Sequence, residues 1–131
     1  MSSEGQPSME DVIRKDGRYP VEAFAFLHEG LSKAVAEVHG AQPPEGSQRH
    51  VTGAQLCHSL KALAVEKWGL LAEAVLAKWN LHATIDFGEM VYLLISHNYM
   101  RKTEEDSLED FRDVFNFEEA FRSMDDFEIK E

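Results

Sequence analysis

The clearest helix signal in the chain is the stretch TGAQLCHSLKALAVEKWG at residues 52–69. It opens with a capping-box pattern, in which the Thr52 hydroxyl accepts one free backbone N–H and the Gln55 side chain accepts another. Apolar residues then recur three or four positions apart, as on the buried face of an amphipathic helix: Leu56, Leu60, Leu63, Ala64 and Trp68. Because Gly69 breaks the pattern, the stretch predicts a helix over 52–68.

Two further helices are predicted on the C-terminal side of this one. Residues 70–79 form a short helix with Leu71 on its apolar face, and Asn80 suits a left-handed stop after it. Thr84 is expected to cap a helix over 84–97. Apolar residues almost surround that helix, which is typical of the central helix of a small domain.

Two helices are also predicted on the N-terminal side. Ser8 suits the cap of a short helix over 9–15. Pro20 suits the first turn of a longer helix over 21–38, because the N–H that proline lacks would have no partner there. Residues 40–49 contain two prolines and two glycines, which predicts a loop between this helix and the next.

Residues 99–115 allow two interpretations. One is a short β-hairpin with its turn near 104–107, following an apolar run that could lead into a wing. The other is a helix capped by Ser107, with Asp110 at the third position. The helical interpretation is favoured by the spacing of four apolar residues, Leu108, Phe111, Val114 and Phe115.

These elements together predict a mainly α fold, a compact bundle of about five helices with at most a small hairpin near 99–115. The single domain is expected to span 9–124, after a disordered N-terminus at 1–8 and before a flexible acidic tail at 125–131. Three helices followed by a hairpin would also resemble a winged-helix arrangement.

Composition limits the function classes. With 131 residues, a mass of 14.9 kDa and 44% hydrophobic residues, the chain has the size and composition of one globular domain. Its net charge of −11 opposes phosphate backbones, and 12 acidic against 5 basic residues place −7 of that charge in 101–131. No Arg or Lys lies between Trp79 and Met100, so helix 84–97 lacks the bases of a DNA-recognition helix.

The same composition predicts a cytoplasmic protein without membrane association. Cys57 is the single cysteine, so no internal disulfide is possible. No apolar run reaches the ~18 residues of a membrane span, and the first ten residues show no secretory signal.

Catalytic and metal-binding patterns are absent from the sequence. No two of the six histidines have the i, i+4 spacing of a helical metal site, so no metal or cofactor is predicted. Cys57, near a helix start, could be a nucleophile but suits an apolar core better. His28 lies on the apolar face of helix 21–38, as a core histidine would. The acidic run 104–110 lacks the glycine and spacing of a calcium loop, and could instead pair with Arg18 or Arg49.

Four segments of the chain resemble a family of small bacterial proteins of unknown function. They are RYP-x-EAF from Arg18, RHVTG-x-QL from Arg49, DFG-x-MV from Asp86 and KTEEDS-x-EDF from Lys102. The resemblance extends over about residues 10–121. It implies a compact single domain in the cytoplasm and no particular reaction, cofactor or catalytic residue.

The leading functional hypothesis is a non-enzymatic module that binds another protein, preferably a basic one, or a second copy of itself. Arg18, Tyr19, Arg49 and His50 form the candidate surface, because they stand beside helix breaks where side chains are free to act. Helix-entry chemistry is an equally good role for them. One alternative is an enzyme or small-molecule binder with a pocket that uses His50, His28 or Cys57. A second is a winged-helix regulator linked to nucleic acid.

Overall fold

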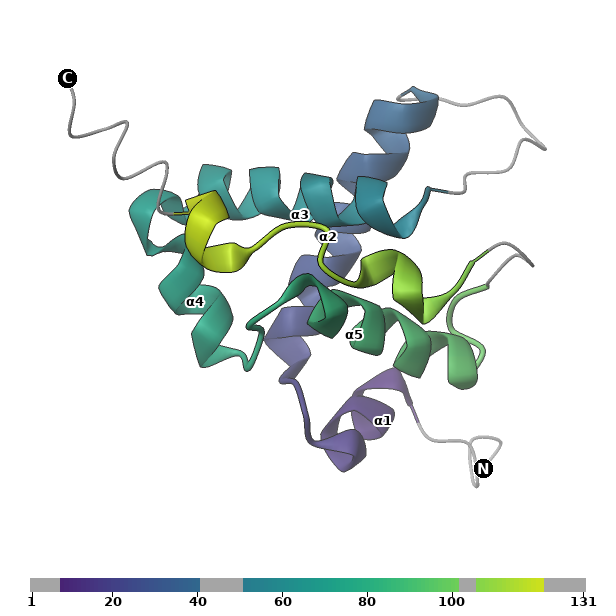
Figure 1. The fold of residues 1–131 in the computed structure, drawn as a ribbon. Helices are drawn as coiled ribbons and strands as arrows, with labels where there is room; N and C mark the ends of the chain where they lie inside the picture. The colour runs from purple at the N-terminus through teal and green to yellow at the C-terminus, as the bar shows by residue number, and fades with distance from the viewer. Residues whose placement is uncertain (1–7, 41–50, 102–105, 122–131) are drawn as a thin grey trace, which may run out of the picture.

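The computed structural model describes residues 8–40, 51–101 and 106–121 of the chain. In these ranges it contains five α-helices and two short 3-10 helices: α1 (Met9–Asp16), α2 (Val21–His39), α3 (Gly53–Trp68), η1 (Gly69–Leu71), α4 (Ala72–Lys78), α5 (Thr84–Ser96) and η2 (Leu108–Phe111). A helical stretch at 117–121 follows. The predicted mainly α fold is therefore confirmed (Figure 1). The predicted tail at 125–131 lies outside the described residues.

Most helix ends coincide with the capping residues that the sequence predicts. Thr52 Oγ1 accepts a hydrogen bond from Gln55 N at 3.0 Å, and Gln55 Oε1 accepts one from Thr52 N at 2.8 Å. The Ser8 hydroxyl caps α1 in the same way, by accepting from Asp11 N at 3.1 Å. Asn80 takes the left-handed conformation predicted for it, with φ 67°. Local sequence thus fixes these boundaries before any tertiary packing is considered.

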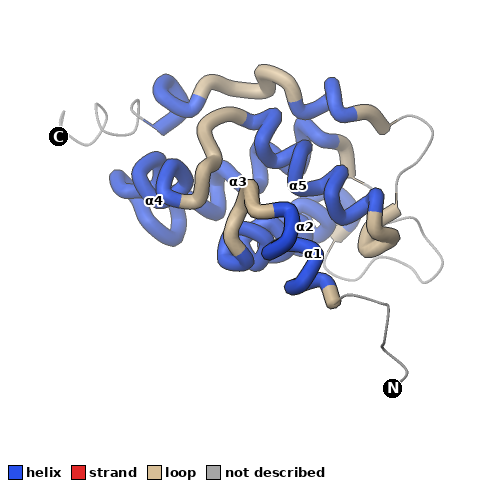
Figure 2. The backbone as a smooth tube through the Cα atoms, turned by 90° about the horizontal axis from the view of Figure 1, so that it is seen from below, coloured by secondary structure: helices blue, strands red, loops and turns tan. Residues whose placement is uncertain are grey.

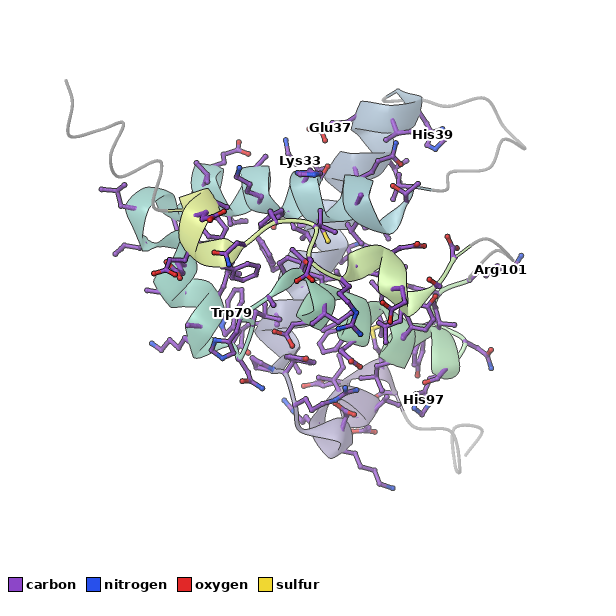
Figure 3. All side chains as sticks on the ribbon, viewed as in Figure 1. Lys33, Glu37, His39, Trp79, His97 and Arg101 are labelled. Atoms are coloured by element: carbon purple, nitrogen blue, oxygen red, sulfur yellow. The ribbon has the colours of Figure 1, made fainter. Side chains whose placement is uncertain are left out.

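Helices α2 and α3 cross closely at Gly30. A Cβ at this position would lie 2.1 Å from Leu60 Cδ2, so only glycine admits the leucine there. At the outer end of α2, Glu37 accepts a hydrogen bond from Ser59 Oγ of α3 at 2.5 Å and pairs with Lys33 Nζ at 3.1 Å (Figure 3). The crossing is therefore held both at its centre and near one end.

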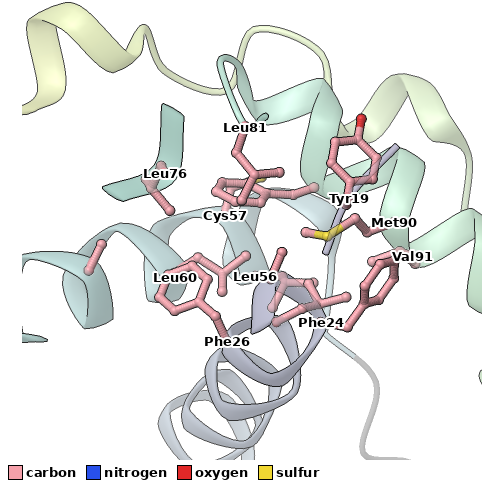
Figure 4. Close-up of a cluster of buried hydrophobic side chains, with 14 of the residues drawn as sticks. Tyr19, Phe24, Phe26, Leu56, Cys57, Leu60, Leu76, Leu81, Met90 and Val91 are labelled. Atoms are coloured by element: carbon pink, nitrogen blue, oxygen red, sulfur yellow. The ribbon is translucent and has the colours of Figure 1, made fainter. Parts of the chain in front are cut away.

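The core lies where α2, α3, α4 and α5 converge (Figure 4). Its largest fully buried side chains include Phe87, Leu60, Leu76, Leu81 and Met90. Tyr19 and Phe24 extend this core toward the junction between α1 and α2. The helices are thus held together mainly by apolar burial, which stabilises a fold in proportion to the area removed from water.

The hairpin proposed near 99–115 is wrong for the described part of this range, which omits 102–105. Residues 108–111 form the 3-10 helix η2, and Figure 2 shows helix and loop without strand along the described chain. Asp110 Oδ2 accepts a hydrogen bond from Ser107 N at 3.0 Å, as the capping alternative predicts. The helix stays short because Phe111 is buried, and the chain then turns away at Arg112 with ψ 127°.

Thr84 does not cap α5, in contrast to the prediction. The cap position belongs to Ala83, and Thr84 is the first residue of the helix, fully buried. Its hydroxyl donates a hydrogen bond to Phe111 O at 2.6 Å and accepts one from Val114 N at 3.1 Å. The residue type that suits a cap therefore serves here to attach a distant segment.

Candidate functional site

A polar cluster surrounds the predicted residues Arg18 and Tyr19, where the α1–α2 junction meets the start of α5. Tyr19 is only 5% exposed, and its hydroxyl donates a hydrogen bond to Asp86 Oδ1 at 2.8 Å. The other oxygen of Asp86 accepts from the backbone N–H groups of His82, at 2.8 Å, and Ala83, at 3.1 Å. Asp86 therefore caps α5 and fastens the Tyr19 side chain at the same time.

Arg18 binds two carboxylates in this cluster. Its Nε lies 3.0 Å from Asp16 Oδ2 and its Nη1 lies 3.0 Å from Glu89 Oε1. The hydrogen bond from Arg18 lowers the pKa of Asp16, although partial burial opposes the shift. Asn80 Nδ2 also donates to the Arg18 carbonyl at 3.1 Å. The guanidinium charge and the backbone carbonyl of Arg18 thus both have partners at the helix junction, which is the helix-entry role predicted for this residue.

The sequence also allowed a pairing of Arg18 or Arg49 with the acidic run 104–110, of which 104–105 lie outside the described residues. Within the described ranges, Arg18 pairs with Asp16 and Glu89, which both lie beside the helix junction. Arg49 and His50 lie outside the described residues. Of the candidate surface, then, Arg18 is partly exposed, whereas Tyr19 is buried and cannot contact a partner directly.

Tyr19→Phe is expected to change how stability depends on alkaline pH. Desolvation first, and then the hydrogen bond to Asp86, raise the pKa of Tyr19 in the folded chain. In the unfolded chain a tyrosine ionises near pH 10, so this residue stabilises the fold fully below that pH and progressively less above it. Urea unfolding followed by circular dichroism should show the variant about 1 kcal/mol less stable at pH 7, with the gap closing toward pH 11.

The exposed tyrosine Tyr99 provides the control for this experiment. Tyr99→Phe removes the same hydroxyl from a side chain that is 37% exposed, so its cost at pH 7 should be smaller than that of Tyr19→Phe. A constant gap between the wild type and Tyr19→Phe up to pH 11 would contradict a buried, protonated Tyr19.

The two candidate pocket residues do not form a site together. His28 is exposed, so its expected place on the apolar face is wrong: the inward face of α2 follows Ala23, Leu27 and Gly30, and His28 lies beyond its edge. Cys57 is completely buried, and burial raises the pKa of its thiol to about 12. Such a thiol is protonated at neutral pH and is a poor nucleophile.

Among the described residues, no group of three or more His, Cys, Asp and Glu side chains is arranged to hold a metal ion. The carboxylates of the polar cluster are already engaged, Asp86 by backbone N–H groups and Tyr19, and Asp16 by Arg18. The cluster can therefore fix the geometry of the α1–α2 and α5 junction, and it leaves part of Arg18 and Glu89 accessible to solvent.

A second feature of the surface is apolar. Leu70 and Leu71, in the 3-10 turn η1 between α3 and α4, are 55% and 66% exposed. The prediction that Leu71 faces inward is wrong. Gly69 turns the chain at φ 52°, and α4 begins at Ala72, directly after Leu71. The inward side chains of α4 are therefore Ala72 and Leu76. We call the exposed pair Leu70 and Leu71 the leucine corner.

An aromatic cluster stands next to the leucine corner. The rings of Trp68 and Trp79 meet edge to face with centroids 5.4 Å apart, and the Phe26 ring of α2 lies 5.3 Å from Trp68 (Figure 3 labels Trp79). The cluster joins the end of α3, the end of α4 and the second turn of α2. It therefore holds the two helices that flank the corner in a fixed relation.

No protein-family model, curated protein or solved structure matches this chain. No helix in the described ranges is both long and apolar enough to cross a membrane. The resemblance to a small bacterial family stays a prediction.

The segments that carry this resemblance meet in space. Tyr19 of the first bonds to Asp86 of the third, and Phe111 of the fourth lies against Gly53 of the second and Gly88 of the third. The four segments therefore mark contacts that hold the fold together.

Proposed function

We propose that the protein is a non-enzymatic interaction module and that the leucine corner is its apolar contact with a partner. The observation that carries this proposal is the exposure of two neighbouring leucines, each more than half accessible to solvent. A partner that covered both side chains would remove their apolar surface from water, which favours association.

The rigid structure around the leucine corner supports its role as a contact. The corner lies at a short turn between two helices, next to the rings of Trp68, Trp79 and Phe26. A preformed contact loses little conformational entropy on binding, so a larger share of the burial is available as affinity. Apolar anchors in such settings often carry most of the binding energy of an interface.

Charge points to a basic protein as the partner. The chain has a net charge of −11, and complementary charge speeds encounter between proteins more than it tightens the final complex. The leucine corner would then supply the anchor, and the acidic surface would supply the steering. Affinity should therefore depend on the two leucines, whereas the association rate should depend on ionic strength.

The double substitution Leu70→Ser and Leu71→Ser tests the proposal. Immobilised protein should capture a basic partner from a native extract, and the double variant should lose at least about tenfold of the affinity for it. Val38→Ser is the matched control, because Val38 is 40% exposed on the distant end of α2. Equal capture by both variants would contradict a contact at the leucine corner.

Light scattering separates a foreign partner from self-association. A monomer at all concentrations, with capture lost in the double variant, supports a basic partner. If the wild type forms a dimer with rising concentration and the double variant does not, the leucine corner is still the contact, but the partner is a second copy of the chain.

A further inference from the structure

Residues 106–121, which we call the strap, lie across the helical body with little regular structure. The strap contains η2, a turn at 112–115 and the helical stretch 117–121, and it runs along α3 and α5 (green to yellow in Figure 1). Three of its phenylalanines, Phe111, Phe117 and Phe121, are only 5–6% exposed. The strap is held by these side chains, two of which, Phe117 and Phe121, lie four residues apart on one face of its helical stretch.

Phe111 occupies a gap that two glycines leave open. A Cβ at Gly88 of α5 would lie 2.7 Å from Phe111 Cγ, and one at Gly53 of α3 would lie 3.1 Å from the same ring. The ring therefore lies against the backbone of both helices, at a point where any other residue would displace it. The strap enters the groove between α3 and α5 at this point.

Farther along, the strap is attached by Thr84 and by ring contacts. The Thr84 hydroxyl bridges Phe111 O and Val114 N, as described above. The Phe117 ring lies 5.8 Å from the ring of Phe87 in α5. The Phe115 ring has Lys61 Nζ of α3 at 5.8 Å from its centroid.

Several hydrogen bonds within the strap are local. Ser107 N donates to Asp110 at 3.0 Å, and Glu119 N donates to Asn116 Oδ1 at 3.0 Å. Its contacts with the body include those of the phenylalanine rings, the Leu108 side chain against Gly88 and the Thr84 bridge. Because most of these contacts are made by side chains, the strap can behave as a cooperative unit distinct from the helices.

Cys57 lies under the strap. It stands one helical turn after Gly53, which contacts Phe111, and one turn before Lys61, which contacts Phe115. The three residues form one row along α3, and Cys57 is 0% exposed. Figure 4 labels Cys57 and Leu81 as members of the same buried cluster.

We propose that the strap opens as a unit while α2–α5 stay folded, and so controls access to the apolar face between α3 and α5. In the closed state this face is covered by Phe111, Phe115 and Phe117. In the open state the row from Gly53 to Lys61, together with Thr84 and Gly88, faces solvent. The strap is a conformational device built from residues separate from the leucine corner.

Thiol labelling of Cys57 in the full-length protein tests this proposal. A coloured disulfide reagent should react with the native protein through local opening, at a rate that rises less steeply with urea than global unfolding does, because opening exposes the strap and the face beneath it but not the rest of the core. Phe111→Ala should raise the native labelling rate about 100-fold or more, and Thr84→Val about tenfold. Far-UV circular dichroism should stay close to that of the wild type in both variants.

Val12→Ala provides the matched control, because Val12 is a buried residue of α1, which lies away from the strap in Figure 1. Its native labelling rate should equal that of the wild type. The proposal is overturned if wild-type labelling follows the full urea dependence of global unfolding from zero urea upward. It is also overturned if Thr84→Val accelerates labelling no more than Val12→Ala does, a comparison that holds even if Phe111→Ala fails to fold.

Discussion

Phe87→Ala is expected to lower the free energy of unfolding by about 3–5 kcal/mol. Phe87 is 1% exposed and is one of the largest fully buried side chains, in the first turn of α5. Its ring meets the Phe117 ring at a centroid distance of 5.8 Å, so the substitution removes contacts within the body and to the strap at once. Urea unfolding monitored by far-UV circular dichroism measures the loss directly.

Phe115→Ala is the control for this prediction. The Phe115 ring also lies 5.8 Å from Phe117, but the residue is half-buried at the edge of the strap. Its substitution should cost about 1 kcal/mol, because less apolar area leaves water there on folding. Equal losses from the two variants would show that α5 is not central to the core.

Gly88→Ala is expected to destabilise the protein by about 1–2 kcal/mol, although alanine favours helices over glycine by about 1 kcal/mol. The reason is the strap: a Cβ at this position would lie 2.7 Å from Phe111 Cγ and 2.9 Å from Leu108 Cδ1. A decrease in the free energy of unfolding would therefore indicate the close contact between α5 and the strap, whereas helix propensity alone predicts an increase. Chemical denaturation of the variant at neutral pH is a sufficient measurement.

A double-mutant cycle identifies the contact responsible. In the background of Phe111→Ala the ring is gone and the strap can shift more easily, although the Cβ of residue 111 at 2.8 Å and Leu108 Cδ1 at 2.9 Å remain, so Gly88→Ala should cost less there. If Gly88→Ala stabilises the otherwise unchanged protein, the close approach of the strap to α5 is wrong.

Helix α3 and its caps could be predicted from local sequence because local interactions determine them. Thr52 and Gln55 need only each other, and Asn80 needs only its own backbone to end a helix. The same holds for the mainly α class, which follows from the spacing of apolar residues along each helix. The Ser107–Asp110 cap within the strap could also be predicted, but the path of the strap across the body could not, because it depends on two glycines from different helices.

Errors at single residues have a similar origin. Thr84 has the side chain of a good cap, but a hydrogen-bond acceptor from the strap, the Phe111 carbonyl, reaches its hydroxyl. Leu71 fits an apolar helical spacing, but the turn at Gly69 moves the start of α4 and rotates the residue outward. In both cases a tertiary or backbone effect outweighs a local preference.

The candidate site was predicted in part. The sequence identified Arg18 and Tyr19 from their place beside a helix break, but it could not show that their partners lie about 70 residues away, at Asp86 and Glu89. The leucine corner gave no sequence signal, because exposed and buried leucines look alike until the helix start is known.

The position of the strap after all five α-helices of the described chain has a further consequence. Helices α3 and α5 precede residues 106–121 in the sequence, so a chain without the strap still contains both helices that flank the covered face. Such a chain would display an apolar face that the finished protein hides. A chain that terminates early, before Phe111, would keep this face permanently and should be recognised by chaperones and proteases as an unfinished product.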